Sequence, residues 1–125
     1  LPAVRWDKVP RGPLPTGCAT LGATRVHIVG ATVYATGPSL TCPASRAYWV
    51  RAVVKLAEYR GRGHWAYVTP AKPSAPHRNR ADAQRSRVHT CRPGTRVRAV
   101  ASFVLTWPDG HQVRYRRLGT SARCS

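Results

Sequence analysis

Acidic residues are almost absent from this sequence. Only Asp7, Glu58, Asp82 and Asp109 stand against 21 lysines and arginines, which gives a formal net charge of +17 at pH 7. Because carboxylates serve as general acids, general bases and metal ligands, their scarcity leaves little material for acid–base or metal chemistry. A charge of this size attracts nucleic acid, anionic membranes or acidic proteins, and composition alone does not choose among them.

Methionine and long apolar runs are missing as well. The chain contains no Met and begins at Leu1, which predicts a processed, secreted product from which a signal peptide has been removed. Its apolar runs are short and interrupted by Arg, so the sequence predicts no membrane-spanning helix. These absences favour an extracellular protein.

Closely spaced cysteine pairs are also absent. The four cysteines are far apart and include no C-x-x-C motif, so they do not fit a zinc site. In a small exported protein, an even number of such cysteines predicts two disulfide bonds. The residues concerned are Cys18, Cys42, Cys91 and Cys124.

What is present fits one globular domain. The chain has 125 residues, of which 42% are hydrophobic, enough for a single core. A shift of 47 residues aligns the sequence VRAV at 50–53 with VRAV at 97–100, and also aligns Gly63-His64 with Gly110-His111. The repeat predicts two similar structural units.

Each unit has the pattern of a β-hairpin. Apolar and polar residues alternate over 97–107, Pro108-Asp109-Gly110 supplies a turn, and 111–118 is the predicted return strand. In the first unit the strand includes 48–56, the turn is 61–63, and 64–68 returns. Residues 24–35 predict one further strand, with a bulge at Val29-Gly30 where the alternation changes phase.

The predicted fold is therefore all-β. We expect a small antiparallel β-sandwich or barrel built from the two similar hairpins plus the N-terminal strand, because no segment shows a helical period. Hairpin geometry places Cys124 close to Cys91, which favours the pairs Cys91–Cys124 and Cys18–Cys42. The alternative, Cys42–Cys91 with Cys18–Cys124, stays open.

Residues 1–17 predict an extended arm ahead of the disulfide-bonded domain at 18–125. Four prolines in LPAVRWDKVPRGPLPTG disfavour helix and sheet interiors. The segment is either a frayed terminus or an arm that docks in the groove of a partner, and the tryptophan weighs towards docking. Its candidate partner-binding residues are Val4, Arg5, Trp6, Lys8 and Arg11.

A second candidate binding segment is the basic loop at 70–90. It contains three prolines and four arginines, and Asp82 is its only acidic residue. A loop of this length is either a finger for an acidic protein or phosphate, or a flexible crossover between the hairpins. The arginines are Arg78, Arg80, Arg85 and Arg87.

No pattern predicts catalysis or a cofactor. The five histidines lack metal-ligand spacing, and no nucleophile elbow or Ser-His-Asp set is present. A ribonuclease built on Glu58 and His64 is the remaining enzymatic hypothesis, and its alternative is that Glu58 pairs with Arg60 or Lys55 on a solvated strand face. We therefore expect a protein that is not an enzyme.

Binding to nucleic acid or to an anionic membrane is less favoured than binding to protein. Trp49, Trp65 and Tyr67 on basic strands are suited to base stacking. The cations, however, are spread over every segment of the sequence rather than gathered on one face, and no amphipathic helix is predicted.

In overall plan the chain resembles the small bridging subunit of the umbrella toxin particles secreted by filamentous actinobacteria. The shared plan is an Arg-rich exported chain, the arm quoted above, and four cysteines across a β pattern. The resemblance implies a non-enzymatic adaptor whose arm enters the groove of a trypsin-like, lectin-bearing subunit. It also implies that the body holds the helical-repeat stalk of a large toxin protein.

Two further functions remain as alternatives to this adaptor. The first is a secreted inhibitor that presents Arg5, Lys8 or Arg11 to a trypsin-like protease. The second is a basic secreted nuclease or antibacterial effector.

Overall fold

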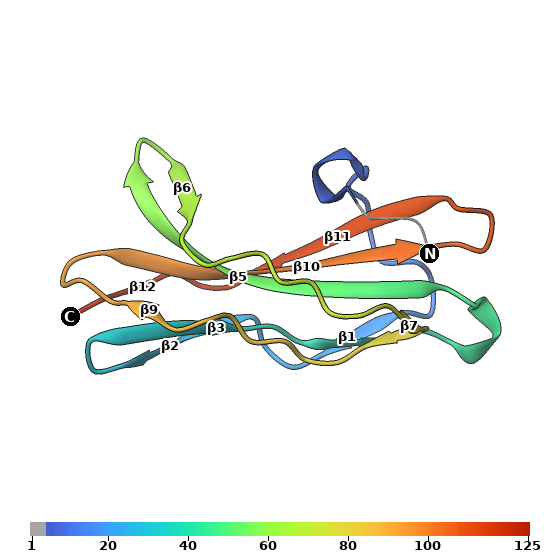
Figure 1. Cartoon of the computed structure of the whole chain (residues 1–125), viewed down its shortest axis with the longest axis horizontal. Helices are drawn as coiled ribbons and strands as arrows, with labels where there is room; N and C mark the ends of the chain where they lie inside the picture. The colour runs from blue at the N-terminus through green and yellow to red at the C-terminus, as the bar shows by residue number, and fades with distance from the viewer. Residues whose placement is uncertain (1–4) are drawn as a thin grey trace.

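The computed structural model describes residues 5–125 as a two-layered β-sandwich (Figure 1). The first layer is the large sheet, with strand order β11-β10-β5-β6, to which β7 and β12 add short pairings. The second layer contains two three-stranded sheets, ordered β1-β4-β8 and β2-β3-β9. The all-β, disulfide-bonded class predicted from the sequence is confirmed.

The large sheet is built on two long central strands. β5 (Trp49–Gly61) and β10 (Arg96–Thr106) pair antiparallel, from Val97 opposite Glu58 to Thr106 opposite Trp49. Their alternating apolar residues face the second layer and form one core with it. The buried residues that the two strands contribute to this core are Val50, Ala52, Val54, Leu56, Val97, Ala99, Ala101, Phe103 and Leu105.

Both predicted hairpins form. β5 returns through β6 (His64–Tyr67), and β10 returns through β11 (Gln112–Leu118). In the second turn the Trp107 amide donates to the His111 carbonyl at 2.8 Å, and Gly110 has a φ of 91°. Glycine is favoured there because this backbone conformation strains other residues.

The predicted single strand at 24–35 is wrong, because that segment is a third hairpin. β2 (Arg25–Val29) pairs antiparallel with β3 (Thr32–Thr36), and the chain reverses at Gly30, whose φ is 60°. A two-residue turn and a bulge both shift the phase of an alternating pattern. The phase change at Val29-Gly30, which was interpreted as a bulge, is therefore the turn of this hairpin. β1 (Ala19–Leu21) and β4 (Ser39–Thr41) pair nearby.

The disulfides are those that hairpin geometry favoured, Cys18–Cys42 and Cys91–Cys124. The first lies beside the β1–β4 pair, within the second layer. The second joins the residue that follows β9 to the residue that follows β12 (Ala122–Arg123), and so connects the two layers. Two disulfides are typical of an oxidising compartment.

The predicted basic loop is a crossover whose backbone is paired with both layers. Within it, β7 (His77–Arg78) pairs with β5, β8 (Arg80–Ala81) pairs with β4, and β9 (His89–Thr90) pairs with β3. The Ser74 amide also donates to the Ala52 carbonyl at 2.7 Å.

Helical structure is confined to two single turns in the described residues, η1 (Trp6–Lys8) and η2 (Ala44–Arg46). No helix within 5–125 has the length and apolar character required to cross a membrane.

Candidate binding surface

The outer face of the large sheet points away from the core. It carries long cationic side chains on β5 and β11, on either side of the uncharged Ser102 and Val104 of β10. Register places Val53 of β5, Ser102 of β10 and Arg116 of β11 side by side across three strands. The next row contains Arg51, Val104 and Arg114. Because side chains alternate along a strand, both rows lie on the same face.

The N-terminal arm is bound along the β11 edge of this sheet. The Arg114 amide donates to the Pro10 carbonyl at 2.8 Å, and the Gly12 amide donates to the Arg114 carbonyl at 3.2 Å. Val9 is buried, with 5% of its surface exposed. A Cβ at Gly12 would lie 2.7 Å from Cγ2 of Val113, so the close approach of the arm requires glycine at this position.

Beyond this anchor, η1 and the β5–β6 hairpin rise on the same side of the large sheet (Figure 1). Between them lies a hollow of about 520 Å³, which we call the basic hollow. Asp7 is the single acid among its lining residues, against five cations. The lining residues are Arg5, Trp6, Asp7, Arg11, Val53, Lys55, Tyr67, Ser102, Arg114 and Arg116.

The charge in the basic hollow is poorly neutralised. Burial, and then the nearby Arg114 guanidinium, lower the pKa of Lys55 from its ordinary value of 10.5. The Lys55 Nζ lies 4.2 Å from the ring centroid of Tyr67, a cation–π contact that partly offsets this cost. Among the described residues, the buried Nε of Arg114 has no hydrogen-bond partner. Such a site favours an anion.

The other aromatic residues of the outer face are covered by cations. Arg98 lies 4.2 Å from the Trp65 ring centroid, Arg96 lies 5.2 Å from that of Tyr59, and Arg78 lies 4.4 Å from that of Trp49. Bases that stack on a protein need free ring faces. These contacts therefore make the strand aromatics less suitable for base stacking than the sequence suggested.

The structure brings together only part of the predicted arm site. Arg5, Trp6 and Arg11 line the basic hollow, whereas Lys8 lines a separate hollow beside His111. Val4 lies outside the described residues.

The four arginines of the predicted loop do not gather into one site, although Arg85 and Arg87 line a hollow of about 250 Å³ together with Lys72. Arg78 stacks on Trp49, Arg80 pairs with the exposed Asp82 at 3.1 Å, and Arg85 lies 4.2 Å from the Tyr34 ring centroid. Arg87 is exposed.

Lys55, Ser102, Arg114 and Arg116 line the hollow but were not among the site residues predicted from the sequence. Alternation along the return strand at 111–118 places Val113 and Tyr115 on the inner side and Arg114 and Arg116 on the outer side, and this is the one signal in the sequence that points to these arginines. It did not show that the arm and the β5–β6 hairpin rise on the same side of the sheet.

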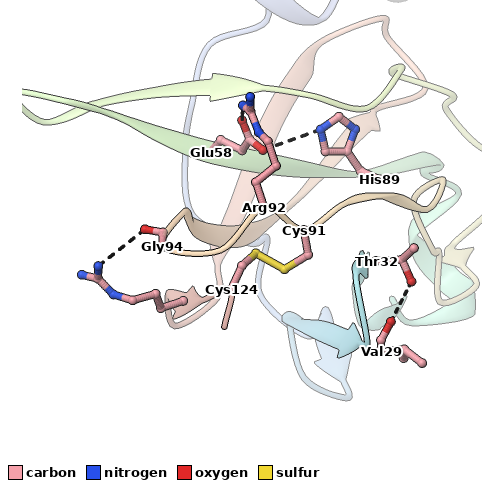
Figure 2. The surroundings of a disulfide bond; sticks show 9 residues. Val29, Thr32, Glu58, His89, Cys91, Arg92, Gly94 and Cys124 are labelled. Carbon is pink, nitrogen blue, oxygen red and sulfur yellow. Dashed lines mark hydrogen bonds and ion pairs between the residues drawn. A yellow bond between two sulfur atoms is a disulfide. The ribbon is translucent and has the colours of Figure 1, made fainter.

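A separate buried ion-pair cluster surrounds Glu58 (Figure 2). Glu58 is 1% exposed, and its carboxylate oxygens lie 3.0 Å from Arg60, 3.6 Å from His89 and 3.7 Å from Arg92. The ribonuclease hypothesis had placed His64 next to Glu58, but the histidine that contacts the carboxylate is His89. Pairing with Arg60 is confirmed, but the expected solvated strand face is wrong, because Glu58 is buried. One carboxylate held between arginines is suited to stabilising this end of the sheet.

Within residues 5–125, no three His, Cys, Asp or Glu side chains are placed to hold a metal ion. Comparison of the chain with protein-family models, curated proteins and solved structures finds no match.

Proposed function

We propose that the chain is a secreted, non-enzymatic adaptor that joins protein subunits of an extracellular complex through its N-terminal arm. The observation that carries this proposal is the anchoring of the arm. Val9 is buried and Pro10–Gly12 pair with β11, so η1 is held above the sheet with Arg5, Asp7 and Lys8 exposed. A recognition segment fixed in this way loses less conformational entropy when it binds.

The resemblance noted in the sequence extends this proposal to an antibacterial toxin particle. In that arrangement the exposed side chains of the arm, rather than its main chain, contact the groove of a trypsin-like, lectin-bearing subunit, and the β-sandwich holds a helical-repeat subunit. The paired crossover and the two disulfides support such a role, because a connector between large subunits has to resist deformation.

The protease-inhibitor alternative receives less support from the arm. Extended peptides bind grooves through free main-chain groups. The Lys8 amide, however, is used in a turn, where it donates to the Arg5 carbonyl at 2.8 Å, and Arg11 is paired with Arg114. Neither basic residue is therefore presented on a free extended backbone.

The test is co-purification of tagged protein from culture supernatant, with the wild type, Trp6→Ala and a truncation that removes residues 1–8. Trp6 is half-buried and next to the exposed arm cations. We therefore expect Trp6→Ala to weaken the binding of one partner by about 2 kcal/mol, a roughly thirtyfold loss of affinity. The truncation should abolish capture of that partner and preserve the fold, because Val9 and both disulfides remain.

Leu21→Ala is the matched control, since Leu21 is an 80% exposed apolar residue outside the arm. It should leave capture unchanged. Full capture by the truncated protein would disprove the role of the arm. Stoichiometric inhibition of a trypsin-like protease that is lost with Lys8→Ala would establish the inhibitor function instead.

A further inference from the structure

We propose that the basic hollow binds an extended acidic segment of a partner protein, with Asp or Glu at alternate positions. This inference rests on the proposed adaptor function and adds the chemistry of one partner.

Charge is the first step of the argument. Five cations line the hollow, and Asp7 is the only acid among its lining residues. Lys55 and Arg114 repel each other there, and the Nε of Arg114 lacks a partner among residues 5–125. An incoming carboxylate would relieve this repulsion and satisfy a buried donor, and both effects favour binding.

Spacing is the second step. Arg114 and Arg116 are alternate residues of β11, so their side chains leave the same face about 7 Å apart. Alternate side chains of an extended peptide have the same separation. Lys55, on β5, faces these two arginines from the opposite side of the hollow, and Ser102 supplies a hydroxyl between them. An extended segment along β11 would therefore meet cations on both sides.

The aromatic contacts favour a peptide over single-stranded nucleic acid. In the hollow, Lys55 occupies one face of the ring of Tyr67, a residue that is 51% exposed, and Arg98 occupies one face of the neighbouring Trp65 ring. Nucleic-acid bases could stack on these two ring faces only by displacing the cations. A polypeptide needs no free ring face for its carboxylates to pair with guanidinium groups.

The probe is a fluorescent synthetic peptide of alternating glutamate and serine, measured by anisotropy against the full chain. A peptide of the same composition with its glutamates in one block tests the spacing. We expect the alternating peptide to bind at least about fivefold more tightly than the blocked one. Arg116→Glu should weaken the binding of the alternating peptide by about tenfold or more.

Arg25→Glu is the matched control, because it makes the same change in net charge at an exposed position of β2 in the opposite layer. It should change the affinity by less than about twofold. Equal losses in Arg116→Glu and Arg25→Glu, or equal affinity for both peptides, would overturn the proposal. Tighter binding of an oligothymidylate that Arg116→Glu abolishes would also overturn it and assign the hollow to nucleic acid.

Failure of this inference is separable from failure of the adaptor function. If Arg116→Glu captures every partner of the wild type at full strength, the hollow is not the acidic-segment site and the adaptor proposal stands. Suppose instead that the wild type binds the alternating peptide with the expected specificity, but the truncated protein still captures every partner. The hollow is then an acidic-segment site, and the adaptor function through the arm is disproved.

Discussion

At the scale of single residues, Lys55 and Glu58 are two half-buried or buried ionisable groups in opposite surroundings. Lys55 is a cation placed among cations, so its charge opposes folding. Glu58 is a buried carboxylate in contact with Arg60 and Arg92, so a substitution that removes its charge leaves these two arginines without their ion-pair partner.

Lys55→Met should stabilise the protein at neutral pH. Because the pKa of Lys55 is lowered in the fold, the unfolded chain retains the proton to higher pH, and stability rises with pH through the folded pKa towards 10.5. The gain from Met should therefore be largest at neutral pH and shrink as the pH approaches 10.5. Denaturant titrations at several pH values between neutral and 10.5 measure the difference in the free energy of unfolding between Lys55→Met and the wild type.

Lys72→Met, at an exposed position of the crossover, is the control and should leave the pH dependence as it is in the wild type. A pH dependence in Lys55→Met identical to that of the wild type would contradict the prediction.

Glu58→Gln should destabilise the protein by about 1–2 kcal/mol without affecting partner capture. The substitution keeps the shape of the side chain but removes the charge that Arg60 and Arg92 contact. The loss stays moderate because both arginines are largely exposed and can be hydrated. Urea denaturation measures the change in the free energy of unfolding. Asp82→Asn is the control: Asp82 forms an exposed ion pair with Arg80, so this substitution should cost less than about 0.5 kcal/mol.

An RNase assay of the same variant tests the enzymatic alternative. RNA cleavage by the pure wild type that disappears in Glu58→Gln would contradict the non-enzymatic proposal.

At the scale of elements, the arm illustrates how one glycine permits a pairing between segments. Gly12 is the residue whose missing Cβ lets the arm approach Val113 on β11. The hydrogen bonds on either side of this contact fix the position of η1. The arm is therefore part of the sheet from Pro10 to Gly12 and a separate turn before Val9.

Gly12→Ala should loosen the arm. The new methyl group would lie 2.7 Å from Val113 Cγ2, and relieving this contact should cost about 1 kcal/mol. Amide exchange at Gly12 and Arg114 should accelerate by several-fold, because both amides donate across the arm–β11 contact.

The double variant Gly12→Ala with Val113→Ala is the control, since it restores the space and should restore protection at both amides. Unchanged exchange in the single variant would mean that the arm adapts without lifting from β11.

Several elements were predictable because their signals are local. Alternation over 97–107 and the Pro108-Asp109-Gly110 turn specify a hairpin without reference to the rest of the chain. The hairpin at β2–β3 was missed because the Gly30 turn and a bulge give the same phase change. The two-residue strands β7, β8 and β9 are too short for any periodic signal, so the crossover was predicted as a loop.

The basic hollow was not predictable for a different reason. Its lining comes from the arm, β5, β6, β10 and β11, which only the fold brings together. Cations occur in every segment of the sequence, but the expectation that they do not gather on one face is wrong, because five of them line this hollow. The sequence has no signal for this gathering. It could not show that Lys55, Arg114 and Arg116 meet on one face.

At the scale of the whole molecule, the two disulfides have different positions relative to the layers. Cys18–Cys42 lies within the second layer, whereas Cys91–Cys124 connects β9 in that layer with β12 in the large sheet. Their sequence separations of 24 and 33 residues close loops of similar size, so the chain-entropy contribution of the two bonds is similar.

Replacing Cys91 and Cys124 together by Ser should lower the free energy of unfolding by about 3 kcal/mol, and so should the same change at Cys18 and Cys42. Guanidinium denaturation of both variants measures this, and non-reducing peptide mapping of the wild type checks the pairing. Peptides that link Cys42 to Cys91 would contradict the pairing described above.

The crossover also affects how fast the molecule folds. β5 and β10 are neighbours in the sheet, yet residues 62–95 separate them along the chain and contact both layers. Single hairpins form within microseconds, but the two central strands can align only after this long segment has closed, which is slow in β-proteins with distant pairings. The native sheet should therefore assemble in milliseconds to seconds, and the late step should be the meeting of two hairpins that are already folded.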